Sequence, residues 1–111
     1  TGMLKRSNRV NTLNRVSFFV TIFIERNHDF PLDDITVLSE QIAGELEQEY
    51  GLTWAWEENK LLINHASARG FLHSEEGKIT IELKLGFAAS LFSASIENHI
   101  SERLDQLLLP N

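Results

Sequence analysis

The sequence predicts an α+β fold in which an antiparallel sheet carries two helices packed on one of its faces. Three observations predict it. Five segments alternate apolar and polar residues with a period of two, and two longer segments repeat apolar residues every three or four positions. The connections between the middle strands are short, as antiparallel pairing allows. The predicted order of elements is therefore β-α-β-β-β-β-α.

The first strand is predicted over residues 15–26, where β-branched and aromatic residues alternate. Ile22 and Ile24 share one face, whereas Phe19 and Phe23 lie on the other. A strand that is apolar on both faces is covered on both sides or takes part in self-association. We expect Phe19 and Phe23 to contact a second copy of the chain or a partner surface. Burial under residues 87–92 or under the N-terminal residues is the alternative.

The first helix is predicted over residues 32–50. Pro31 suits the start of a helix, and Asp33 and Asp34 complement the positive end of the helix dipole. Gly51 suits a left-handed cap at the other end. Between these signals one apolar stripe recurs at helical spacing, formed by Ile35, Leu38, Ile42, Leu46 and Tyr50.

Four strands follow, over residues 52–57, 60–65, 69–73 and 78–85. Their predicted turns are Glu58-Asn59, in which asparagine tolerates a positive φ, then residues 66–68 and 74–77. Residues 78–85 alternate most cleanly, which predicts one packed face and one wet face. A turn over residues 66–68 would place His65 and His73 on the same face of the sheet without making them neighbours.

The last helix follows an apolar link over residues 87–92. Ser93 or Ser95 can cap its start, an apolar stripe runs from Ile96 to Leu108, and Pro110 stops it. The two helices together can cover one face of the sheet, which gives a two-layer domain.

The charge is unevenly distributed. The net charge is −6, but residues 1–15 carry four basic residues and no acid, so the rest of the chain carries −10. We expect residues 1–15 to form a basic arm that is disordered or partly tag-derived, and residues 16–111 to form one domain. An acidic body repels phosphates, so no nucleic-acid partner is expected. The apolar run over residues 16–24 is too short for a transmembrane segment, which favours a cytoplasmic protein.

Two groups of residues are candidate binding sites. Arg26 and His28 end a strand where the chain enters a helix, a common position for a site. Their structural interpretation is that Arg26 pairs with the acidic helix and His28 binds backbone. Trp54 and Trp56 share a strand face with Leu52, which is typical of a core. The alternative is an aromatic-lined pocket for an acyl chain between the sheet and the helices.

Signs of catalysis and of cofactors are lacking in the sequence. The chain has no cysteine, and its four histidines are not spaced as metal ligands, so no metal site is expected. A Gly-x-Ser-x-Gly elbow, a phosphate-binding loop and a dinucleotide-binding fingerprint are also missing, so we expect no cofactor. The sequence names no catalytic residue and favours a protein that is not an enzyme.

Residues 21–108 resemble a known family. The resemblance is carried by the strand end Ile24-Glu25-Arg26-Asn27-His28, the helix end Tyr50-Gly51-Leu52 with Trp54 and Trp56, Gly70, the strand 79–85 closed by Gly86, and Ile96-Glu97-Asn98-His99-Ile100. These features resemble the polyhydroxyalkanoic acid system protein family of small bacterial proteins. The sequence departs from it at Glu58-Asn59, which stands in place of a glycine-containing turn, and in residues 3–15.

The resemblance implies a biological context rather than a reaction, because members are encoded beside genes for polyhydroxyalkanoate storage granules. We expect a non-enzymatic accessory or binding protein of the granule system, with the granule, its proteins or a second copy of the chain as partner. The alternative is a small hydrophobic-ligand-binding protein or enzyme that uses a pocket between the sheet and the helices.

Overall fold

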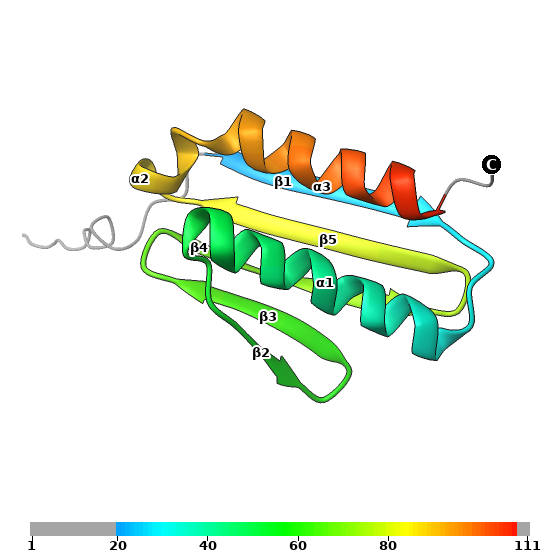
Figure 1. The fold of residues 1–111 in the computed structure, drawn as a ribbon. Coiled ribbons are helices and arrows are strands. Elements are labelled where there is room, and N and C mark those ends of the chain that lie inside the picture. Colours follow the sequence, from blue (N-terminus) through cyan, green and yellow to red (C-terminus); the bar gives the residue numbers. More distant parts are fainter. Residues whose placement is uncertain (1–19, 109–111) are drawn as a thin grey trace, which may run out of the picture.

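A computed structural model describes residues 20–108 (Figure 1) and confirms the predicted α+β fold. Its five-stranded sheet has the order β1-β5-β4-β3-β2, and all neighbouring strands are antiparallel. The two long helices, α1 and α3, lie on the same face of the sheet (Figure 1). The elements are β1 Val20–Asn27, α1 Leu32–Tyr50, β2 Trp54–Glu57, β3 Lys60–His65, β4 Ala68–Glu75, β5 Lys78–Leu85, the short α2 Phe87–Ser90, and α3 Ser93–Leu108.

The core lies between the sheet and these two helices. The strand register brings one row of aliphatic side chains from each of β1, β5, β4 and β3 to this inner face, where they meet the stripes of α1 and α3. All four inward residues of β5 are fully buried, namely Ile79, Ile81, Leu83 and Leu85. Gly70 permits close packing of β4 on β5, because a Cβ there would lie 2.0 Å from the carbonyl oxygen of Glu82.

The first helix has the predicted bounds and ends. Asp33 and Asp34 occupy its first turn, and Gly51 adopts a left-handed conformation with φ of 73°. The Gly51 N–H donates to the carbonyl of Glu47, which satisfies an end group that the helix leaves unpaired. The predicted stripe is buried except for Tyr50, which is half-buried, and Ser39 and Ala43 are buried in addition.

Three turns differ from the sequence-based prediction, and one of them is the turn between β4 and β5, which contains only Glu76 and Gly77 rather than residues 74–77 because β4 continues to Glu75. The turn between β3 and β4 contains only Ala66 and Ser67, so His65 lies opposite Ala68, and His73 lies opposite Lys60. The prediction that the two histidines share a face is therefore wrong, because removing one residue from a turn reverses the facing of the strand that follows. In the β2–β3 turn the residue with positive φ is Glu58, at 57°, rather than Asn59.

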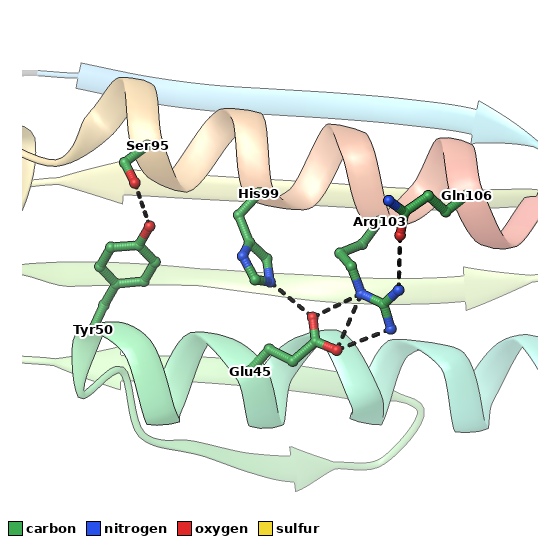
Figure 2. Close-up of polar contacts among 6 residues, drawn as sticks. All are labelled: Glu45, Tyr50, Ser95, His99, Arg103 and Gln106. Carbon is green, nitrogen blue, oxygen red and sulfur yellow. Dashed lines mark hydrogen bonds and ion pairs between the residues drawn. The ribbon is translucent and has the colours of Figure 1, made fainter.

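The link over residues 87–92 contains the helical turn α2. Ser95 does not serve as a cap, since its hydroxyl hydrogen-bonds the hydroxyl of Tyr50 (Figure 2). At this end of the molecule, which we call the α2 end, β1 begins, β5 and α1 finish, and α3 begins (Figure 1). The basic arm, Phe19 and Pro110 lie outside the described residues.

The other face of the sheet, which we call the open face, has neither α1 nor α3 over it (Figure 1). One row of directly paired residues crosses it from edge to edge. The row consists of Phe23, Glu82, Phe71, Leu62 and Ala55. It is apolar apart from Glu82, which separates Phe23 on the edge strand β1 from the other three apolar residues.

Candidate functional site

A polar cluster joins α1 to α3 (Figure 2). Glu45 of α1 accepts hydrogen bonds from two α3 residues that are one turn apart. His99 Nε2 lies 2.8 Å from its Oε1, and Arg103 Nη2 lies 2.9 Å from its Oε2. The Arg103 Nε is within 3.1 Å of both carboxylate oxygens, and its Nη1 donates to Gln106. Both oxygens of the carboxylate are therefore engaged.

The surroundings of Glu45 favour its charged form. Burial by itself acts to raise the pKa of this carboxyl, but the hydrogen bonds and positive charge supplied by Arg103 and His99 outweigh it. The pKa of Glu45 consequently lies below its ordinary value of 4.5. The three side chains are only 24–29% exposed, so this interaction is partly shielded from solvent.

The sequence analysis did not find this cluster. It identified the apolar stripes of the two helices and assigned no contact to Glu45, His99 or Arg103. The available signal was the four-residue spacing of His99 and Arg103, which places both on one side of α3. Their partner could not be identified from spacing, because it depends on how α1 and α3 lie against each other.

A hollow of about 290 Å³ opens at the α2 end, between α1, α2, α3 and β3. Its lining is mostly apolar and includes Leu52, Ala88, Phe92 and Ile96. His65 supplies a polar group, and its Nδ1 accepts a hydrogen bond from the Ser67 N–H, so the neutral ring carries its proton on Nε2. The hollow can therefore offer a hydrogen-bond donor to a small apolar ligand.

Arg26 and His28 both make contacts within the fold. The Arg26 guanidinium donates to Ser101 Oγ at 2.9 Å and lies 3.5 Å from Asp105. These side-chain partners are on α3, whereas the sequence-based interpretation placed them on the first, acidic helix. The buried His28 ring accepts the Phe30 N–H at Nδ1 and donates from Nε2 to a carbonyl of β4. These bonds join β1 to α3 and to the neighbouring turn, and they do not bring the two side chains to one site.

The two tryptophans are on β2, the edge strand that pairs with β3. Trp54 is half-buried and packs against the core, while Trp56 is 37% exposed and donates its indole N–H to Glu40 of α1. Trp56 lines a shallow depression with Leu32 and Thr36. The hollow at the α2 end has about the same volume, and neither tryptophan lines it.

The expected self-association residues are only partly described. Phe23 is 56% exposed on the open face, whereas Phe19 precedes the described residues. Within residues 20–108, no three histidine, aspartate or glutamate side chains are grouped closely enough to hold a metal ion. The described part of the chain also contains no helix that is long and apolar enough to cross a membrane.

Comparisons with known proteins identify a fold and a family. The chain is similar to the NMR structure of PA4090 from Pseudomonas aeruginosa, with a TM-score of 0.50 and 11% sequence identity over 86% of this chain and 88% of that one. At this identity the likeness shows the fold alone. No curated protein matches the chain by sequence. A family model described as "Putative polyhydroxyalkanoic acid system protein" matches residues 22–108.

Proposed function

The chain belongs to the polyhydroxyalkanoic acid system protein family, and from this membership we propose that it is a non-enzymatic accessory or binding protein of the bacterial polyhydroxyalkanoate storage-granule system. The family name supports the granule context. The structural feature that supports a binding role is the apolar row on the open face.

That row offers a contact surface. Phe23 is more than half exposed, and Phe71 and Leu62 are half-buried on the same face, separated from Phe23 by Glu82. Among the described residues no helix covers this face. Each aromatic side chain carries on the order of 150–250 Å² of surface, so Phe23 and Phe71 offer apolar area on either side of Glu82. On this proposal the open face is buried against a second copy of the chain or against the granule.

A second candidate function follows from the hollow at the α2 end. Its volume, apolar lining and one oriented histidine fit the binding of a short acyl chain. Because the hollow lies between the sheet and the helices, it corresponds to the alternative of a small hydrophobic-ligand-binding protein or enzyme.

Co-sedimentation with purified polyhydroxyalkanoate granules tests the proposed function. We expect the wild-type chain to sediment with granules and Phe23→Ser to sediment at least about threefold less, because the substitution removes the most exposed ring of the row. The control is Val37→Ser, which removes an equally exposed apolar side chain (55%) from α1.

Sedimentation velocity of the same variants distinguishes a second copy from the granule as the partner. Failure of the wild-type chain to bind granules would contradict the proposal. If the wild-type chain instead bound a fluorescent fatty acid, and Ala88→Trp at the mouth of the hollow abolished that binding, the second candidate would replace it.

A further inference from the structure

The hollow at the α2 end contains a hydrogen-bond donor that the fold does not use. His65 ends β3 and pairs with the buried Ala68, which places its side chain on the inner face of the sheet, where it lines the hollow. The Ser67 N–H occupies its Nδ1 at 3.0 Å, so the neutral ring carries its proton on Nε2. No group within residues 20–108 accepts that proton, and Nε2 is therefore available to a ligand.

The hollow offers no positive charge to a ligand. Among the described residues that line it there is neither lysine nor arginine, and its one charged side chain is Glu49, at an exposed position near the end of α1. Glu49 has no ion-pair partner in the described part of the chain. A carboxylate only accepts hydrogen bonds, and it repels a second anion. A fatty acid in the hollow would therefore hold its own carboxylate close to Glu49 without a counter-ion.

The remaining walls of the hollow suit a short alkyl chain. Leu52 and Ile96 are buried at its base, and the rings of Tyr50 and Phe92 lie 6.1 Å apart between their centroids. The Tyr50 hydroxyl is paired with Ser95 Oγ, which fixes the position of the ring (Figure 2). The volume of about 290 Å³ is small for a ligand pocket, which favours a short chain over a long one.

We propose that this hollow binds the acyl group of an uncharged ester, whose carbonyl accepts the hydrogen bond of His65 Nε2 while its alkyl chain lies along Tyr50 and Phe92. An ester supplies the acceptor that the histidine lacks and has no charge for Glu49 to repel. The inference rests on the second candidate function, the hydrophobic-ligand site, and adds the class of its ligand. A polyhydroxyalkanoate is itself a polyester, so a segment of the polymer and a soluble acyl ester both offer this chemistry.

Titration of the full chain at neutral pH with three ligands, followed by the NMR shifts of its backbone amides, tests the inference. Methyl octanoate, octanamide and octanoate share one alkyl chain and differ in the head group. We expect the two uncharged ligands to bind at least about tenfold more tightly than octanoate, because only octanoate brings a second carboxylate to Glu49. Octanamide controls for the extra methyl group of the ester. Equal affinities for octanamide and octanoate would overturn the inference and leave a hydrophobic-ligand site in place.

Substitutions in the hollow test the two polar groups separately. Glu49→Gln should raise the affinity for octanoate about fivefold and change that for methyl octanoate less than about twofold. The matched control Glu47→Gln removes the same charge from an exposed position of α1 that does not line the hollow, and an equal effect of the two variants would overturn the inference. His65→Phe should weaken the binding of methyl octanoate about fivefold. If that variant has a lower melting temperature, the Nε2 resonance of wild-type His65 replaces it and should shift when methyl octanoate binds.

Ala88→Trp, at the exposed mouth of the hollow, distinguishes the two sources of the ester. The variant should no longer bind methyl octanoate. If it also sediments less with polyhydroxyalkanoate granules, the polymer is the source, whereas unchanged sedimentation identifies a soluble ester. Failure of all three ligands to bind the wild-type chain would overturn both this inference and the second candidate function. The granule proposal would not be affected, because wild-type co-sedimentation measures it independently.

Discussion

Replacing Glu45 by glutamine should destabilise the protein at neutral pH but not in acid. The substitution keeps the size of the side chain and removes the charge that engages Arg103 and His99 at 2.8–2.9 Å. A fully exposed ion pair is worth about 0–1 kcal/mol, and a two-oxygen contact that is less than one-third exposed is worth more. We expect Glu45→Gln to cost about 1–2 kcal/mol at pH 7.

The pH dependence has a definite sign. The pKa of Glu45 is lowered by folding, so its contribution is fully present above the ordinary value of 4.5 and is lost as the pH falls through the lower folded value. In acid the carboxyl is protonated in both states, and wild type and variant should then converge.

Urea unfolding followed by far-ultraviolet circular dichroism measures the loss of unfolding free energy in Glu45→Gln at pH 7 and at pH 3. Glu47→Gln is the matched control, because Glu47 is exposed on the same helix and its side chain makes none of these contacts. Equal losses for the two variants at pH 7, or a Glu45→Gln loss that is undiminished at pH 3, would refute the reasoning.

Two other substitutions test the fold. Leu83→Ala should lower the free energy of unfolding by about 2–5 kcal/mol, because truncating a fully buried leucine leaves a cavity. Thr80→Ala on the open face should lower it by about 0.5 kcal/mol or less. Equal losses in urea unfolding would mean that the two faces of β5 are misassigned. Glu58→Gly should stabilise the protein by roughly 0.5–1 kcal/mol, since Glu58 has φ of 57° and glycine adopts this conformation without strain. An unchanged or lower melting temperature for Glu58→Gly would contradict that account.

The elements with strong periodicity were predictable from the sequence. Residues 32–50 and 78–85 match α1 and β5 in both bounds, because an uninterrupted stripe and a clean alternation each allow one placement only. The β3–β4 turn was not predictable, because Ala66, Ser67 and Ala68 suit a turn of two or three residues equally well. The choice between them decides which face His73 occupies, and cross-strand packing makes that choice.

The candidate site was less accessible to sequence reasoning than the fold. Arg26 was expected to bind the acidic first helix. Its partner Asp105 is instead on α3, which lies over β1 (Figure 1). Local patterns indicate which side of a helix is polar, but they do not indicate which two polar sides will face each other. The Glu45 cluster and the hollow at the α2 end both arise from such non-local packing.

The position of β1 has a consequence for the order of folding events. The strands β2 to β5 form a meander in which each pairs with its sequence neighbour, so these contacts close short loops. In contrast, β1 pairs only with β5, and paired residues such as Ile24 and Ile81 are separated by most of the described chain. Closing that long loop costs conformational entropy, which the contacts of β1 with β5 and with α3 must offset. We therefore expect the folding rate to depend on the pairing of β1 with β5 rather than on the formation of the hairpins.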